Sequence, residues 1–339
     1  MSTNDIAIVG YAHTAVAQTT RSETQLLFPV VRDALAMAGL DRDEVGFVCA
    51  GSCDYLTGGP FAFVFNLEAA GAWPPICESH VEMDGAWALY EAWIRLLHGD
   101  IDTALVMGSG KSSSSRPEEV WTIQGDPYFS APLGLDAYSL AGLQARALLE
   151  SGRATERDLA EVAVRAGRAA DVDTALAADY LRAPLRHHDL APFSDGAAAV
   201  VLARGERARQ LSPNPVWISG IDHRVEAHLP GFRDLATSVS STLAARKAGY
   251  DGGPLDVAEL CATSTAQELI LRAALGIPDS ASVNSSGGPL ITNPVMATGL
   301  IRFIEAAARI RDGSARRAIA HAAGGQALQQ NLVAMLEAR

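Results

Sequence analysis

The stretch His80–Lys111, HVEMDGAWALYEAWIRLLHGDIDTALVMGSGK, decides the fold of this chain. It predicts a helix with Asp84 as its N-cap, a stop at Gly99 and a buried strand over Ala104–Met107. The helix is apolar on almost every side, and such a helix belongs in the interior of a large protein. We therefore expect this segment to lie in the middle of the molecule.

The same pattern occurs a second time, in Thr298–Gly325 (TGLIRFIEAAARIRDGSARRAIAHAAGG). The two stretches share the spacing between their glycines and between several apolar residues. The matched pairs are Gly85 with Gly299, Gly99 with Gly313, Gly110 with Gly324, Leu89 with Phe303, Leu96 with Ile310 and Leu105 with Ile319. Long internal repeats indicate an architecture of similar units. We infer a duplication of about half of the chain.

Strand and helix patterns alternate in both halves, which is typical of an α/β protein. The first half predicts strands over Asp5–Tyr11 and Val45–Ala50, with a helix over Glu23–Met37 between them. The further expected elements are strands over Pro192–Ala203, Val216–Ile221, Val257–Cys261 and Asn331–Leu336, and helices over Asp234–Ala248 and Ser264–Leu275.

Residues 111–190 interrupt this alternation, because about 80 residues are too many for a connection between neighbouring strands. They contain the aromatic residues Trp121, Tyr128 and Phe129, and predict helices over Leu140–Ser151 and Glu156–Asp171. We interpret them as an inserted loop or cap domain that walls a substrate cleft. The alternative is a helical insert that only covers the surface.

The length of 339 residues predicts more than one core. We expect a first half formed by 1–110 with 191–210, the insert, and a second half formed by 211–339. A net charge of −12 argues against nucleic acid as a partner. Four cysteines fit neither a disulfide framework nor a metal-binding pair, so we expect reduced thiols and no metal. With no signal peptide and no apolar stretch of about 20 residues, a cytoplasmic protein without a membrane span is expected.

Four segments together resemble the thiolase superfamily, and most of all its sterol-carrier or lipid-transfer-protein type, over essentially the whole chain. They are Gly85 with its helix, the SDGAAA segment at 194–199, Glu259-Leu260 through Glu268-Leu269, and Gly287-Gly288 through Asn293-Pro294 to Gly299. The resemblance implies a five-layer αβαβα sandwich with the two apolar helices in its middle layer. It also implies a dimer through an edge strand, either with itself or with a thiolase-like paralogue.

The chain departs from the family at the catalytic positions. Glu82 stands where the resemblance places the nucleophilic cysteine, and Asn293 where it places a histidine before proline. Cys261 stands at the polar residue after Glu-Leu, and His321, within one residue, at the second cysteine. A Claisen reaction through an acyl-cysteine is therefore not expected. Cys77 and Cys261 are candidate replacement nucleophiles, although we interpret both as buried structural cysteines.

The remaining chemistry is that of a CoA thioester and its enolate. The family fold would place helix-terminal N–H groups at the thioester oxygen, in a pocket framed by the glycines at Gly287, Gly288, Gly324 and Gly325. Asn293 keeps a donor, and Glu82 near the helix start can accept a proton. A base and an enolate-stabilising pocket suffice for retro-aldol cleavage of a β-hydroxyacyl-CoA. CoA enters only as part of the substrate, and no permanent cofactor is expected.

Some lipid-transfer-type members, which the chain resembles, lack the cysteine and act as aldol lyases on steroid side-chain CoA thioesters. They work with a small OB-fold and zinc-ribbon partner and use a tyrosine base in the C-terminal half. No tyrosine follows Tyr250 here, so we expect the base to be Glu82, His321 or a tyrosine of the first half. Two alternatives stay open: a non-catalytic subunit of a heteromeric acyl-CoA complex, and an acyltransferase with a non-standard site.

Overall fold

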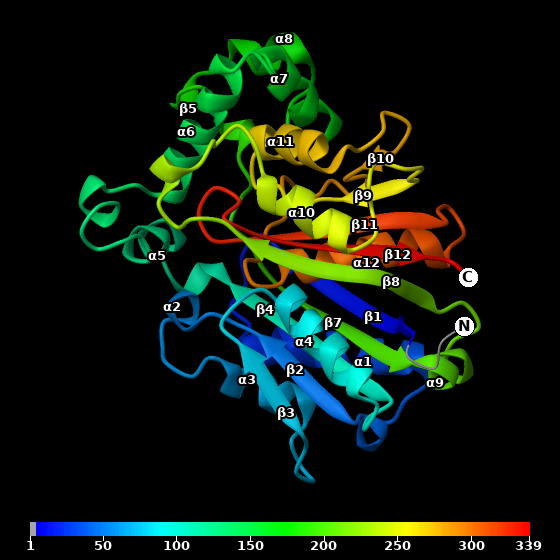
Figure 1. Ribbon diagram of the computed structural model, residues 1–339. Helices are drawn as coiled ribbons and strands as arrows, with labels where there is room; N and C mark the ends of the chain where they lie inside the picture. Colours follow the sequence, from blue (N-terminus) through cyan, green and yellow to red (C-terminus); the bar gives the residue numbers. More distant parts are fainter. Residues whose placement is uncertain (1–4) are drawn as a thin grey trace.

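Figure 1 shows the computed structural model of the chain, which describes residues 5–339. Ten strands form one sheet in the order β10-β9-β11-β12-β8-β1-β7-β4-β2-β3. Their bounds are β1 Ile6–Val16, β2 Phe47–Gly51, β3 Glu78–Val81, β4 Thr103–Lys111, β7 Asp195–Arg204, β8 Val216–Val225, β9 Val257–Glu259, β10 Ser282–Val283, β11 Arg317–Gly324 and β12 Gln330–Glu337. A separate two-stranded sheet joins β5 (Tyr180–Arg182) to β6 (Leu185–Arg186).

The strand pairing repeats in two halves. In the first half β3, β2 and β4 are parallel, and β7 and β1 continue the sheet in antiparallel fashion. In the second half β10, β9 and β11 are parallel, and β12 and β8 continue it in the same way. The halves join where β1 pairs with β8. The duplication inferred from the glycine spacing is therefore confirmed at the level of strand topology.

Helices occupy three layers around these strands (Figure 1). The helices that form the layers are α1 Glu23–Ala38, α4 Gly85–His98, α10 Val239–Lys247, α11 Thr265–Leu275 and α12 Thr298–Arg311. In the middle, α4 and α12 pack on each other and on strands of both halves, whereas α1 covers β1 and β7 and α10 covers β8 and β12 from outside. This is the expected αβαβα sandwich, and its central core is largely alanine and branched aliphatic side chains.

The central helix α4 forms as its sequence predicts. The Asp84 side chain accepts a hydrogen bond from the N–H of Ala86, and Gly99 ends the helix in the left-handed conformation with φ 81°. Its buried face includes Ala86, Ala88 and Leu89. Trp93 and Leu97 are only partly buried, so this side of the helix is more exposed than its apolar sequence predicted.

The insert, residues 112–194, lies between β4 and β7 and packs against α11 through α6 and α7. The remaining helices are α2 Asp54–Thr57, α3 Phe63–Ala70, α5 Pro117–Ile123, α6 Ala137–Glu150, α7 Glu156–Arg165, α8 Val172–Ala177 and α9 Gly205–Leu211. The single helix expected over Glu156–Asp171 ends early, because Gly167 adopts φ 71° and Asp171 caps a new helix by accepting from Thr174 N. In residues 5–339 no helix is long and apolar enough to cross a membrane.

Replacing Phe303 with alanine tests the middle layer. Phe303 is 0 % exposed on α12, and the truncation leaves a cavity among the buried side chains of strands from both halves. We expect the free energy of unfolding in urea to fall by about 3–5 kcal/mol. Phe232→Ala, at a site that is 79 % exposed, is the control and should change it by less than about 0.5 kcal/mol. Equal effects of the two substitutions would contradict the packing described here.

Candidate active site

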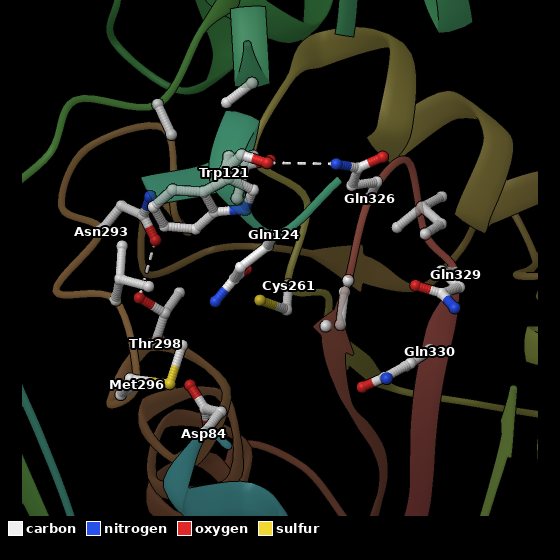
Figure 2. Close-up of a pocket in the computed structure, with 18 of the residues that line it drawn as sticks. Asp84, Trp121, Gln124, Cys261, Asn293, Met296, Thr298, Gln326, Gln329 and Gln330 are labelled. Atoms are coloured by element: carbon white, nitrogen blue, oxygen red, sulfur yellow. Dashed lines mark hydrogen bonds between the residues drawn. The ribbon is translucent and has the colours of Figure 1, made fainter. Parts of the chain in front are cut away.

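A cavity of about 400 Å³ lies where the N-terminal ends of α4 and α12 meet the insert (Figure 2). The helix starts contribute Asp84 and Thr298 to its walls, and the insert contributes Gln124 and Tyr138. The turn between β11 and β12 supplies the opposite wall. The site therefore draws on residues of both halves and of the insert.

One carboxylate joins the starts of both central helices. Asp84 Oδ1 accepts hydrogen bonds from Ala86 N at 2.8 Å and from Leu300 N at 3.0 Å, and Oδ2 accepts from Gly299 N at 2.8 Å. A Cβ at Gly299 would lie 2.5 Å from Asp84 Oδ1, so only glycine permits this approach. Burial raises the pKa of Asp84, and the three N–H donors oppose that rise. These N–H groups are thus used within the protein, and the expectation that they bind a thioester oxygen is wrong.

Glu82 lies in the cavity at the position that the sequence indicated. Its side chain is exposed, and Oε1 accepts a hydrogen bond from Asp54 N at 2.7 Å. The Cys53 thiol lies beside this carboxylate, and burial raises the pKa of Cys53 to about 11. The backbone therefore holds Oε1 of Glu82 in place. The side chain remains accessible to a ligand, as a proton acceptor requires.

Asn293 is oriented by its neighbours. Its Oδ1 accepts a hydrogen bond from Thr298 Oγ1 at 2.8 Å, and its backbone N donates to Ser194 Oγ at 2.7 Å. Because the carbonyl oxygen is occupied, the amide Nδ2 is the group that Asn293 can offer to a ligand. Trp121 of α5 also lines the cavity.

The four predicted glycines divide into two pairs. Gly324 and Gly325 line the cavity. Gly287 and Gly288 do not, and instead shape the loop that leads to Asn293, with φ values of 90° and 60° that side chains other than glycine rarely adopt. The first pair can contact a ligand directly, and the second acts on the site through the backbone.

Cys261 lines the cavity, but its surroundings do not make it a nucleophile. Burial raises the pKa of its thiol to about 12, so the thiolate is scarce at neutral pH. Figure 2 shows the sulfur pointing into the cavity. Cys77 is exposed and outside the cavity lining, so the prediction that Cys77 is buried is wrong.

His321 lies behind Cys261 and does not line the cavity. Its Nδ1 accepts from Cys261 N at 3.3 Å, and its Nε2 therefore carries the proton and donates to Asn331 Oδ1 at 3.0 Å. Burial lowers the pKa of His321 to about 4. Both ring nitrogens are thus committed to the protein, which leaves His321 as a positioning residue for the strand end that carries Cys261.

Three further features complete the site; Tyr138 is one of the first-half tyrosines kept as a possible base, whereas Gln124 and the other glutamines were not indicated by the sequence. Tyr138 reaches the cavity from α6, and burial raises its pKa, which keeps its hydroxyl protonated at neutral pH. Gln124 projects its amide into the cavity from the end of α5, as Figure 2 shows. Several glutamines line the β11–β12 wall. Within residues 5–339 no cluster of three or more His, Cys, Asp or Glu residues could hold a metal ion.

The neutral, buried state of His321 predicts a pH dependence of stability. Below about pH 6.5 the unfolded chain binds a proton that the folded chain takes up only near pH 4, so stability falls as the pH falls through this window. We expect this loss to be on the order of 3 kcal/mol in urea unfolding, and His321→Gln to remove it. His98→Gln, at an exposed site, should keep the wild-type pH profile. An unchanged profile in His321→Gln would show that His321 is not buried neutral.

The fold of this chain, but not its sequence, matches known proteins. No family model matches the chain, and no curated protein matches it by sequence. Solved structures do match: the "Ltp2-ChsH2(DUF35) aldolase" has a TM-score of 0.81 at 20 % identity, covering 99 % of this chain and 98 % of that chain. An acetyl-CoA acetyltransferase of Bacillus anthracis has a TM-score of 0.82 at 16 % identity over 99 % of both chains. Human mitochondrial 3-ketoacyl-CoA thiolase in complex with CoA has a TM-score of 0.76 at 13 % identity, covering 99 % and 98 %. These similarities extend over nearly the full length of the chain, and the chain has the thiolase fold.

Proposed function

We propose that this chain binds acyl-CoA thioesters in the cavity and cleaves a carbon–carbon bond of a β-hydroxyacyl-CoA, such as a steroid side-chain CoA, by a retro-aldol reaction. The observation that carries the proposal is the pairing of an accessible carboxylate, Glu82, with an oriented amide donor, Asn293, in one cavity. One of the similar structures is an aldolase and another binds CoA, which supports a thioester substrate.

The proposed reaction needs a base and a donor at the thioester oxygen. Glu82 takes the proton of the β-hydroxyl group, and the oxygen's electrons form the carbonyl of the leaving ketone or aldehyde. The bond between the α and β carbons breaks, and its electron pair moves into the thioester to give an enolate. Asn293 Nδ2 and the Gln124 amide stabilise the enolate oxygen by hydrogen bonds. Glu82 then returns its proton to the α carbon, which releases a shortened acyl-CoA.

Thiolysis is not favoured by the same residues. A thiolase reaction needs a thiolate and a base that activates it, whereas Cys261 has a pKa near 12 and His321 has no free ring nitrogen. An acyltransferase with a non-standard site would have to use one of the two protonated thiols, Cys53 or Cys261. The retro-aldol reaction requires neither.

The partners follow as further parts of this proposal. CoA is present only as part of the substrate. The strand β3 is an edge of the sheet with one free side, which suits pairing with a second copy or with a thiolase-like paralogue. An OB-fold partner with a zinc ribbon, in the cytoplasm, would complete the assembly. The alternative is a non-catalytic subunit, which the absence of the thiolase cysteine at Glu82 favours.

Glu82→Gln tests the base. The substitution keeps the shape of the side chain but removes its ability to accept a proton, so we expect kcat to fall by about 10²–10⁴-fold with little change in substrate affinity. The assay measures acetyl-CoA or propionyl-CoA released from a β-hydroxy steroid side-chain CoA thioester, with the chain alone and with a co-encoded OB-fold protein. Cys261→Ser is the matched control and should retain activity. No turnover in wild type, together with a tight complex with another thiolase-like chain, would favour the non-catalytic subunit.

Asn293→Ala tests the enolate donor in the same assay. Loss of one preorganised donor should lower kcat by about 10²–10³-fold. Asn293→His supplies a ring N–H in its place and should retain more activity than the alanine variant, while Asn214→Ala, at an exposed site, should behave as wild type. Wild-type kcat in Asn293→Ala would exclude this residue from enolate stabilisation.

A further inference from the structure

The turn between β11 and β12 presents a wall of glutamines, which we name the glutamine wall: Gln326, Gln329 and Gln330. All three line the cavity. The turn that carries them is unusual, because Ala327 and Leu328 have φ values of 50° and 60°. Non-glycine residues adopt such values at a cost of about 1–3 kcal/mol each, and they persist where the surrounding structure enforces them.

Polar side chains enforce this conformation from outside the turn. Arg233 donates to Gln326 O at 2.9 Å and to Ala327 O at 3.0 Å. From inside the fold, Asn331 Nδ2 donates to Leu328 O at 2.7 Å. The backbone of the wall is therefore fixed, and its side chains project from a rigid frame, which suits specific recognition.

The amide groups of the wall leave their carbonyl oxygens without partners. Gln326 Nε2 donates to Trp121 O at 3.2 Å and Gln329 Nε2 donates to Glu226 O at 3.5 Å. These two bonds identify the nitrogen and the oxygen in the amides of Gln326 and Gln329. Gln326 is 4 % exposed, and its Oε1 is buried with no hydrogen-bond partner among the described residues. No donor in residues 5–339 reaches the oxygens of Gln329 or Gln330 either. The oxygens of Gln329 and Gln330 lie against Gly325 and Gly324, the two glycines that line the cavity.

Unpartnered carbonyl oxygens in a half-buried site favour a ligand that brings hydrogen-bond donors. A buried acceptor without a donor costs about 1–3 kcal/mol, and a hydroxyl group of the ligand removes that cost. A carboxylate or a ketone brings only acceptors, and like an alkyl group it leaves these oxygens unpaired. We propose that the glutamine wall selects acyl groups that carry hydroxyl groups on the part remote from the thioester. This inference rests on the proposed binding of acyl-CoA thioesters and names the class of acyl group.

Two thioesters that differ by one hydroxyl test the proposal. The probes are cyclohexylacetyl-CoA and trans-4-hydroxycyclohexylacetyl-CoA, neither of which has a β-hydroxyl group to be cleaved, so their dissociation constants can be measured by calorimetry with the full chain. We expect the hydroxylated probe to bind roughly 3–10-fold tighter to wild type, as one or two added hydrogen bonds would give. Both probes contain the same pantetheine and nucleotide, so contacts to those parts cancel.

Variants then assign the preference to the wall. The double variant Gln329→Leu with Gln330→Leu should bind the two probes equally, whereas Gln330→Glu keeps acceptor oxygens and should keep the preference. Gln210→Leu, exposed on α9, is the matched control. Equal binding of both probes by wild type overturns the hydroxyl proposal and leaves acyl-CoA binding intact. Binding of neither probe overturns acyl-CoA binding itself, and the hydroxyl proposal with it. A preference that survives in the folded double leucine variant shows that another part of the cavity is responsible.

Discussion

The middle layer depends on a single carboxylate between two helix ends. The N-terminal ends of α4 and α12 meet at the cavity, and the positive ends of two helix dipoles at close range repel each other. Asp84 removes this conflict by accepting N–H groups from both helices. Glycine is needed at Gly299 for the same contact, because a Cβ there would lie 2.5 Å from Asp84 Oδ1, and a Cβ at Gly85 would be tightly packed at 3.0 Å from Gly108 Cα. The two halves have similar strand topologies, but the carboxylate that joins their central helices, Asp84, comes only from the first half.

This arrangement has a direct consequence for chemistry at the site. Helix N-termini are ready anion sites when their N–H groups are free. Here the protein's own carboxylate accepts three of these N–H groups, and in the proposed reaction the enolate is stabilised by the side chains of Asn293 and Gln124. Fold and catalytic apparatus are therefore separable in this chain. Asp84 holds the starts of α4 and α12 together. The proposed reaction uses other residues of the cavity and needs no thiolate.

The features that could be predicted from the sequence are those with local signals. Periodic apolar residues and helix-ending glycines identified both central helices, and the matched glycines identified the duplication. The strand β3 was missed because its residues are polar and lie at a sheet edge, where no alternation is imposed. Asp84 was recognised as the cap of its own helix, but its contact with Leu300 joins residues remote in sequence. The same limit applies to His321, whose burial depends on strands and helices from the whole second half.

His321 has a structural role in a hydrogen-bond network that reaches the cavity wall. Its ring accepts from Cys261 N and donates to Asn331, and Asn331 in turn donates to Leu328 O and to Ser240 Oγ at 2.7 Å. Ser240 Oγ continues the chain to Glu226 Oε1 at 2.5 Å. One buried network therefore connects the strand end at Cys261 with the turn that bears the glutamine wall. Since each buried polar group in it has a partner, replacing any one leaves others unsatisfied and disturbs the turn. His321 thus connects to the turn at the cavity through this network, although it does not itself line the cavity.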